Sequence, residues 1–152
     1  MSTDEQNPQT PKLTILFIDD EQDIRKLIRF ILERQGYRVL TAENGAVGLA
    51  MSTTEHPDVI LLDLMMPTMN GHEVLRRLKA NPVTQDIPVI VLTAMGADKD
   101  AALSLELGAV SHMEKPYQAK ELMEEIKIAV WKHHNVHPQA PAAPSTPSAP
   151  AA

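Results

Sequence analysis

The feature that most constrains this chain is a continuous apolar run at residues 59–62 that ends in the carboxylate of Asp63. A turn segment containing Pro67, Asn70 and Gly71 follows directly. A short apolar run with β-branched residues predicts a strand that is buried on both faces. Asp63 then lies at the carboxyl end of the strand, where open α/β sheets bind ligands. Because Asp is also a favoured turn residue, this stretch alone supports a ligand site and a turn cap about equally.

The rest of the chain alternates between short apolar runs and amphipathic segments. We expect strands at residues 13–18, 37–41, 58–63, 88–93 and 110–113. Helical spacing predicts a first helix that packs through Ile24, Leu27, Ile28, Ile31 and Leu32, and a last helix that packs through Leu122, Ile126, Ala129 and Val130. Further helices are expected at about residues 45–54, around 74–78 and at 97–107. Repeated strand–helix units predict an α/β fold with a parallel sheet and helices on both faces.

The helix expected at residues 45–54 follows the second predicted strand. We predict that it packs through Val47, Ala50 and Met51.

The acidic residues after the first predicted strand exclude one common α/β site. A nucleotide-binding domain of the Rossmann type carries a glycine-rich loop at this position, whereas this chain has Asp19, Asp20 and Glu21.

Composition limits the classes of protein that this chain can belong to. Its 152 residues suit one domain, predicted at residues 12–135, between disordered tails at residues 1–11 and 136–152; the second tail is rich in Pro and Ala. A net charge of −6 argues against nucleic acid as the main partner. The chain has no cysteine, no basic and apolar leader, and no run of the roughly 18 apolar residues that a membrane span needs. We therefore expect a cytoplasmic protein.

Polar residues follow the predicted strands at the edge where the strands end. They are Asp19, Asp20, Asp63, Thr93 and Lys115. Because the carboxyl ends of parallel strands share one edge, these side chains are expected to converge. Three carboxylates in one cleft repel each other, and a hard divalent cation, expected to be Mg²⁺, relieves that repulsion. A carboxylate nucleophile, a cation, an ammonium group and a hydroxyl together predict a site that accepts a phosphoryl group.

These motifs resemble the receiver domain of two-component response regulators. The resemblance rests on the Asp19–Asp20 pair, residues 63–71 (DLMMPTMNG), Thr93 with Ala94, and Lys115 with Pro116, and it covers about residues 13–132. The resemblance is specific because several motifs occur in the family's order and at family-like spacings. It implies a flavodoxin-like, doubly wound (βα)5 fold with a five-stranded parallel sheet in the order 2-1-3-4-5.

The resemblance also implies roles for single residues. Asp63 is expected to accept a phosphoryl group from a histidine kinase or a histidine phosphotransfer protein. Asp19, Asp20, Asp63 and the backbone carbonyl of Met65 are expected to bind Mg²⁺. Thr93 is expected to contact the phosphoryl group and to shift inward on activation, and Lys115 to pair with Asp63.

Two further expectations concern the end of the domain. The peptide bond between Lys115 and Pro116 is expected to be cis, as in the family. The family usually has an aromatic switch residue three positions before the lysine, whereas this chain has His112. We expect Thr93 and His112 to occupy the two switch positions, and Glu114 to be a solvated acid of the loop.

Three candidate functions, each from a different functional class, are considered for this sequence. The first is a stand-alone receiver without a DNA-binding output domain, which signals by docking to a downstream target protein or passes the phosphoryl group on. The second is a phosphohydrolase with an aspartate nucleophile, disfavoured because Met65 stands where that class has its second Asp. The third is a pseudo-receiver that binds partners without phosphorylation. The first is preferred, because the chain retains the acids, the hydroxyl and the lysine, of which a pseudo-receiver usually lacks at least one. Slow self-dephosphorylation is also expected, because the resemblance places Met65 and Met95 beside the path of the attacking water and thioethers are poor hydrogen-bond acceptors.

Overall fold

The computed structural model describes residues 12–67 and 69–136. The first predicted tail, residues 1–11, lies outside the described residues. Residues 137–152 of the second predicted tail also lie outside them. Residue 136 is the last residue of a helix, one position beyond the predicted end of the domain. None of the helices in the described ranges has the length and apolar character needed to cross a membrane.

The described chain alternates strictly between strands and helices. The strands are β1 (Thr14–Ile18), β2 (Arg38–Ala42), β3 (Val59–Asp63), β4 (Val89–Thr93) and β5 (Ser111–Glu114). The helices are α2 (Gln22–Glu33), α3 (Gly45–Glu55), α4 (Gly71–Ala80), α5 (Asp98–Glu106) and α6 (Ala119–Val136). All neighbouring strands pair in parallel, in the order β2-β1-β3-β4-β5. The predicted flavodoxin-like fold and strand order are confirmed.

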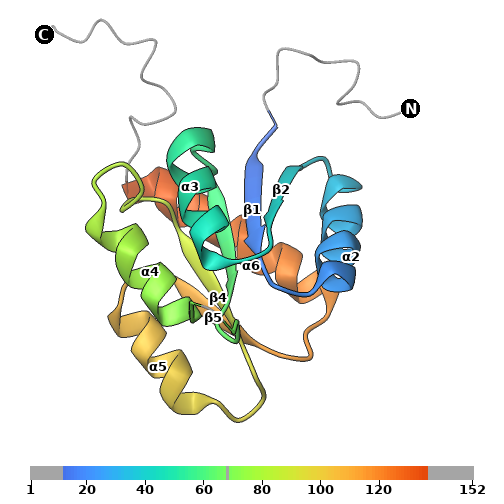
Figure 1. The fold of residues 1–152 in the computed structure, drawn as a ribbon. Helices are drawn as coiled ribbons and strands as arrows, with labels where there is room; N and C mark the ends of the chain where they lie inside the picture. The colour runs from blue at the N-terminus through green and yellow to red at the C-terminus, as the bar shows by residue number, and fades with distance from the viewer. Residues whose placement is uncertain (1–11, 68, 137–152) are drawn as a thin grey trace, which may run out of the picture.

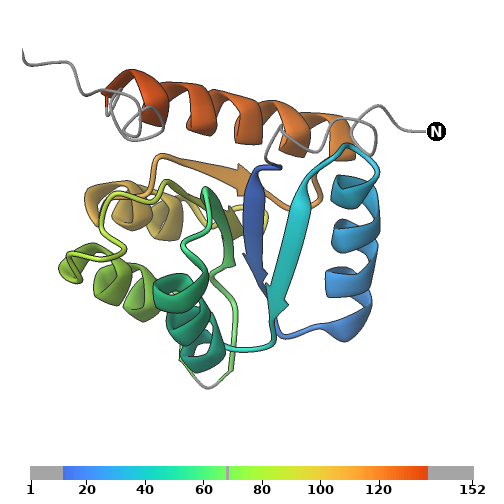
Figure 2. The same cartoon turned by 90° about the horizontal axis from the view of Figure 1, so that it is seen from above.

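The sheet is the middle layer of three. Helices α2 and α6 cover one face, and α3, α4 and α5 cover the other (Figures 1 and 2). Alternate residues of each central strand enter the two cores. In β1, Ile15 and Phe17 pack toward α2 and α6, whereas Leu16 and Ile18 pack toward the opposite layer. This burial on both faces explains why the central strands are apolar at every position except one end residue, which is Thr14 in β1, Asp63 in β3 and Thr93 in β4.

Helix α3 differs from its predicted packing. Its buried positions are Gly45, Gly48 and Ser52, whereas Val47 and Ala50 are exposed and Met51 is only half-buried. The prediction is confirmed for Met51, which packs against the core on this side of the sheet, and is wrong for Val47 and Ala50. Helical periodicity detects large apolar side chains, whereas this helix approaches the sheet mainly through small residues. A Cβ on Gly48 would stand 2.5 Å from the δ-methyl of Ile18. The close approach of the helix to β1 therefore depends on the missing side chain.

Helix α2 also departs in part from its predicted packing. Ile28 and Leu32 are buried as predicted, and Ile24 packs against the same core. Leu27, however, is 53% exposed, as is its neighbour Phe30 at 59%. The apolar stripe of this helix is therefore wider than the surface that the sheet covers.

Replacing Gly71 with Ala is expected to destabilise the fold by about 1–3 kcal/mol, since overpacking at a rigid neighbour costs this much. The new Cβ would lie 2.6 Å from the Cα of Leu64, and backbone cannot move aside as a side chain can. Gly48→Ala is the matched control, because its first obstacle is the mobile end of Ile18. Urea unfolding should show the larger loss for Gly71→Ala; an equal or smaller loss would contradict this explanation.

Candidate functional site

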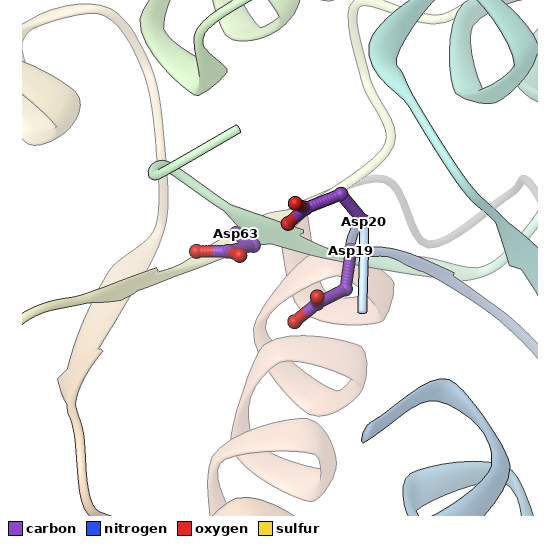
Figure 3. Close-up of side chains that lie close together, drawn as sticks. All are labelled: Asp19, Asp20 and Asp63. Carbon is purple, nitrogen blue, oxygen red and sulfur yellow. The ribbon is translucent and has the colours of Figure 1, made fainter. Parts of the chain in front are cut away.

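Three carboxylates converge at the carboxyl ends of β1 and β3 (Figure 3). Asp19 and Asp20 follow β1, and Asp63 is the last residue of β3. One carboxylate oxygen from each lies within 4.8 Å of the others. Asp19 and Asp63 are 0% and 2% exposed, whereas Asp20 is exposed. Two buried acids and one solvent-facing acid therefore surround a single point at the predicted sheet edge.

Backbone groups hold the two buried acids in place. Oδ1 of Asp19 accepts a 2.8 Å hydrogen bond from the N–H of Glu21, and Oδ1 of Asp63 accepts a 3.0 Å bond from the N–H of Met65. The guanidinium of Arg25 donates to the carbonyl of Asp19 at 2.8 Å. Asp63 thus caps the turn after β3, as one interpretation of the sequence predicted, and it also faces the acidic cluster.

The cluster is electrostatically strained without a cation. Burial raises the pKa of Asp19 from its ordinary value of 3.8 to about 6; the charges of Asp63 and Asp20 add to this, and the hydrogen bond from Glu21 opposes it. Its second oxygen, Oδ2, is buried and has no hydrogen-bond partner among the described residues. An unpartnered carboxylate oxygen beside two other acids is the donor set that a hard divalent cation requires. The residues present therefore fit a metal ion.

Lys115 and Thr93 extend the site on the side of β4 and β5. Nζ of Lys115 lies 3.2 Å from Oδ1 of Asp63, and the peptide bond that follows Lys115 is cis, as the resemblance implies. The hydroxyl of buried Thr93 donates to the carbonyl of Met113 at 3.3 Å. The lysine thus already contacts the acidic cluster, whereas the threonine hydroxyl is engaged by β5.

The remaining predicted residues, Met65, Met95 and His112, have exposed side chains. Met65 and Met95 are 59% and 71% exposed, so neither is part of the core. His112 is exposed on β5, in register with Val91, and lines an open groove with Glu121.

Two residues near the site have surroundings that the sequence analysis did not predict. Glu114 is the last residue of β5 rather than part of a loop, and its carboxylate accepts a 2.8 Å hydrogen bond from the N–H of Gly96, so it is not merely a solvated acid. Tyr117 packs against the core beside the acids; burial raises the pKa of its phenol to about 12, and the charges of Asp19 and Asp63 contribute. For Tyr117 the only available signal was its position two residues after Lys115.

Comparison with known proteins identifies the family. The family model described as "Response regulator receiver domain" matches residues 15–127. The phosphate regulon transcriptional regulatory protein PhoB of Pseudomonas aeruginosa is 44% identical over 114 residues, which cover 75% of this chain and 50% of that protein. The alkaline phosphatase synthesis transcriptional regulatory protein PhoP of Bacillus subtilis is 41% identical over 113 residues, 74% of this chain and 46% of that protein. The chain spans about half the length of these curated relatives.

Solved structures agree with this assignment. A response regulator receiver domain protein from Clostridium thermocellum superposes with a TM-score of 0.77 at 35% identity, covering 82% of this chain and 98% of that one. A CheY-like receiver domain protein from Methanospirillum hungatei also gives 0.77, at 28% identity and the same coverage of both chains. On the evidence of its fold, its acidic cluster and these matches, the chain belongs to the response regulator receiver domain family.

Proposed function

We propose that this domain accepts a phosphoryl group on Asp63 from a phosphohistidine of a histidine kinase or a histidine phosphotransfer protein. One observation carries the proposal: buried Asp63 has Lys115 in contact with its carboxylate and Asp19 and Asp20 beside it. A nucleophilic carboxylate next to an ammonium group and a candidate cation site is the arrangement that transfer of a charged group requires.

The transfer is a single displacement at phosphorus. A carboxylate oxygen of Asp63 forms a bond to the phosphorus as the phosphorus–nitrogen bond of the phosphohistidine breaks. The electron pair of that bond stays on the imidazole, and Asp63 becomes an acyl phosphate. Lys115 is placed to pair with the new phosphoryl oxygens, because its Nζ already lies beside Oδ1 of Asp63.

Mg²⁺ is the cation that we propose for the acidic cluster. Asp19, Asp20 and Asp63 would hold it, together with the backbone carbonyl of Met65. When bound, it supplies positive charge that offsets the carboxylates and the incoming phosphoryl group. The unpartnered Oδ2 of Asp19 supports this assignment, since a buried carboxylate oxygen without a donor favours a cation.

The net charge of the chain bears on the kind of partner that receives the signal. The charge of −6 over the chain favours a protein rather than a nucleic acid as the direct contact of this domain. The domain would signal by docking to a downstream protein or by returning the phosphoryl group to another histidine. It catalyses only its own phosphorylation and dephosphorylation and turns over no external substrate.

Acetyl phosphate with Mg²⁺ tests the proposal without a known kinase. Intact-protein mass spectrometry of the full chain is expected to show one added phosphoryl group, and none when Mg²⁺ is removed with a chelator. Absence of labelling under both conditions, in a protein that circular dichroism shows to be folded, would refute the phosphoacceptor role.

The phosphorylated protein is expected to lose its phosphoryl group slowly. Hydrolysis needs a water held in line with the phosphorus–oxygen bond, and the thioethers of Met65 and Met95 accept hydrogen bonds poorly. Both side chains are largely exposed, so they are free to move, and the family resemblance places them beside the path of the attacking water. The Met65→Asn, Met95→Glu double variant should therefore decay several-fold faster in a phosphate-release assay. Equal or slower decay in the double variant would show that these methionines do not control access of water.

A further inference from the structure

The carboxylate of Glu114 makes a contact that the proposed phosphotransfer does not use. Its Oε2 accepts a 2.8 Å hydrogen bond from the backbone N–H of Gly96. Glu114 is the last residue of β5, and Gly96 lies in the segment between the end of β4 and the start of α5, which we call the β4–α5 loop (residues 94–97). A single side chain therefore links this loop to the neighbouring strand.

Three consecutive residues of the chain fix the end of β4. The carbonyl of Met113 accepts a hydrogen bond from the Thr93 hydroxyl at 3.3 Å, and the N–H of Lys115 donates to the Thr93 carbonyl at 2.8 Å. Glu114, between them, is in register with Thr93 and extends past it to Gly96. The position of Thr93 and the position of the β4–α5 loop are thus set by the same short segment.

The loop itself has little packing to hold it. Gly96 has φ +81°, and no atom lies within 4 Å of the point where its Cβ would stand. Met95 beside it is 71% exposed. A hydrogen bond from the N–H of Ala97 to the carbonyl of Ala94, at 3.2 Å, closes the turn. A loop with so few contacts is sensitive to each hydrogen bond that fastens it.

We propose that Glu114 is a positioning residue that holds the β4–α5 loop where the Thr93 hydroxyl stays on Met113, and so opposes phosphorylation of Asp63. The inference rests on the proposed function. A hydroxyl donates only one hydrogen bond, so Thr93 cannot donate to Met113 and to a phosphoryl oxygen at once. The loop begins at the next residue, so a shift of Thr93 toward Asp63 has to carry the loop with it. Loss of the bond from Gly96 to Glu114 removes part of the resistance to that shift.

Beryllofluoride with Mg²⁺ is a suitable probe, because it binds a carboxylate oxygen as a non-covalent counterpart of a phosphoryl group. Glu114→Ala removes the acceptor of the Gly96 N–H, whereas Glu114→Gln keeps an acceptor oxygen and removes only the charge. Glu124→Ala is the matched charge control, since Glu114 and Glu124 line the same open groove beside His112. The dissociation constant of beryllofluoride is measured for the native full-length chain and each variant, and the hydrogen-exchange rate of the Gly96 amide is measured without the probe.

Glu114→Ala is expected to bind beryllofluoride about two- to tenfold more tightly, which is the range for one hydrogen bond. Its Gly96 amide should exchange faster than in the native protein. Glu114→Gln and Glu124→Ala should stay close to native in both measurements. This pattern separates the hydrogen bond from the charge.

Four results would overturn the inference. Equal tightening in Glu114→Ala and Glu114→Gln would assign the effect to charge alone. Faster exchange at Gly96 with unchanged affinity would show that the bond holds the loop without opposing the switch. If the native protein binds no beryllofluoride, the proposed function fails and this role of Glu114 fails with it, whereas native binding with an unchanged Glu114→Ala variant overturns only the role of Glu114.

Discussion

Replacing Asp63 with Asn is expected to abolish phosphorylation of the protein by acetyl phosphate and Mg²⁺. The amide is neutral and has no carboxylate oxygen that can form an acyl phosphate. Its carbonyl oxygen can still accept the hydrogen bond that the N–H of Met65 donates to Asp63 in the native protein. The turn after β3 is therefore kept, and the variant should fold. Intact-protein mass spectrometry should show no added phosphoryl group.

Asp58→Asn is the matched control for this loss. Asp58 immediately precedes β3, at the strand end remote from the acidic cluster, and its carboxylate accepts a 2.7 Å hydrogen bond from the N–H of Thr14. The control removes one carboxylate charge from the same strand without touching the site, so labelling should remain at the native level. Undiminished labelling of Asp63→Asn would place the acceptor elsewhere.

The sheet and the placement of the acids could be predicted because they depend on strong, local signals. A strand buried on both faces is built mainly from apolar residues, so β1, β3 and β4 stand out from their surroundings. The first polar residue that ends each apolar run marks the edge of the sheet. Parallel pairing then brings Asp19 and Asp63 to one edge without any knowledge of side-chain conformations.

The features that escaped prediction depend on contacts between segments that are distant in sequence. The packing of α3 through Gly48 could not be read from periodicity, because a missing side chain leaves no apolar signal. The bond between Glu114 and Gly96 joins residues 18 positions apart. The direction of the Thr93 hydroxyl is set by the carbonyl of Met113, a backbone group that any residue type supplies. Sequence patterns identify residue types, whereas these details depend on where the backbone passes.

The stability of the metal-free protein is expected to fall as the pH rises from about 4 to about 6, through Asp19. Burial raises the pKa of Asp19 from 3.8 to about 6 in the folded protein. Between these two values the unfolded chain has lost the proton while the folded protein still holds it, so a rise in pH favours unfolding. Above pH 6 the acid is ionised in both states, and the loss is complete. Its size is on the order of 3 kcal/mol at most.

Asp19→Asn isolates this contribution. An amide at this position can still accept the hydrogen bond from the N–H of Glu21, and it carries no charge at any pH of the experiment. The gain in unfolding free energy of the variant over the native protein should be small near pH 4 and should reach its full size above pH 6. Urea unfolding in the presence of a chelator, at several pH values, measures this difference.

Asp20→Asn removes the same charge from an exposed position in the same cluster, so its gain should be smaller. Mg²⁺ added at pH 7 binds the folded state preferentially and should stabilise the native protein more than Asp19→Asn. A gain for Asp19→Asn that is largest at low pH would have the wrong sign for a buried acid with a raised pKa. In that case the carboxylate would be stabilised by its surroundings without a cation, and the unpartnered oxygen of Asp19 would no longer argue for a metal at this site.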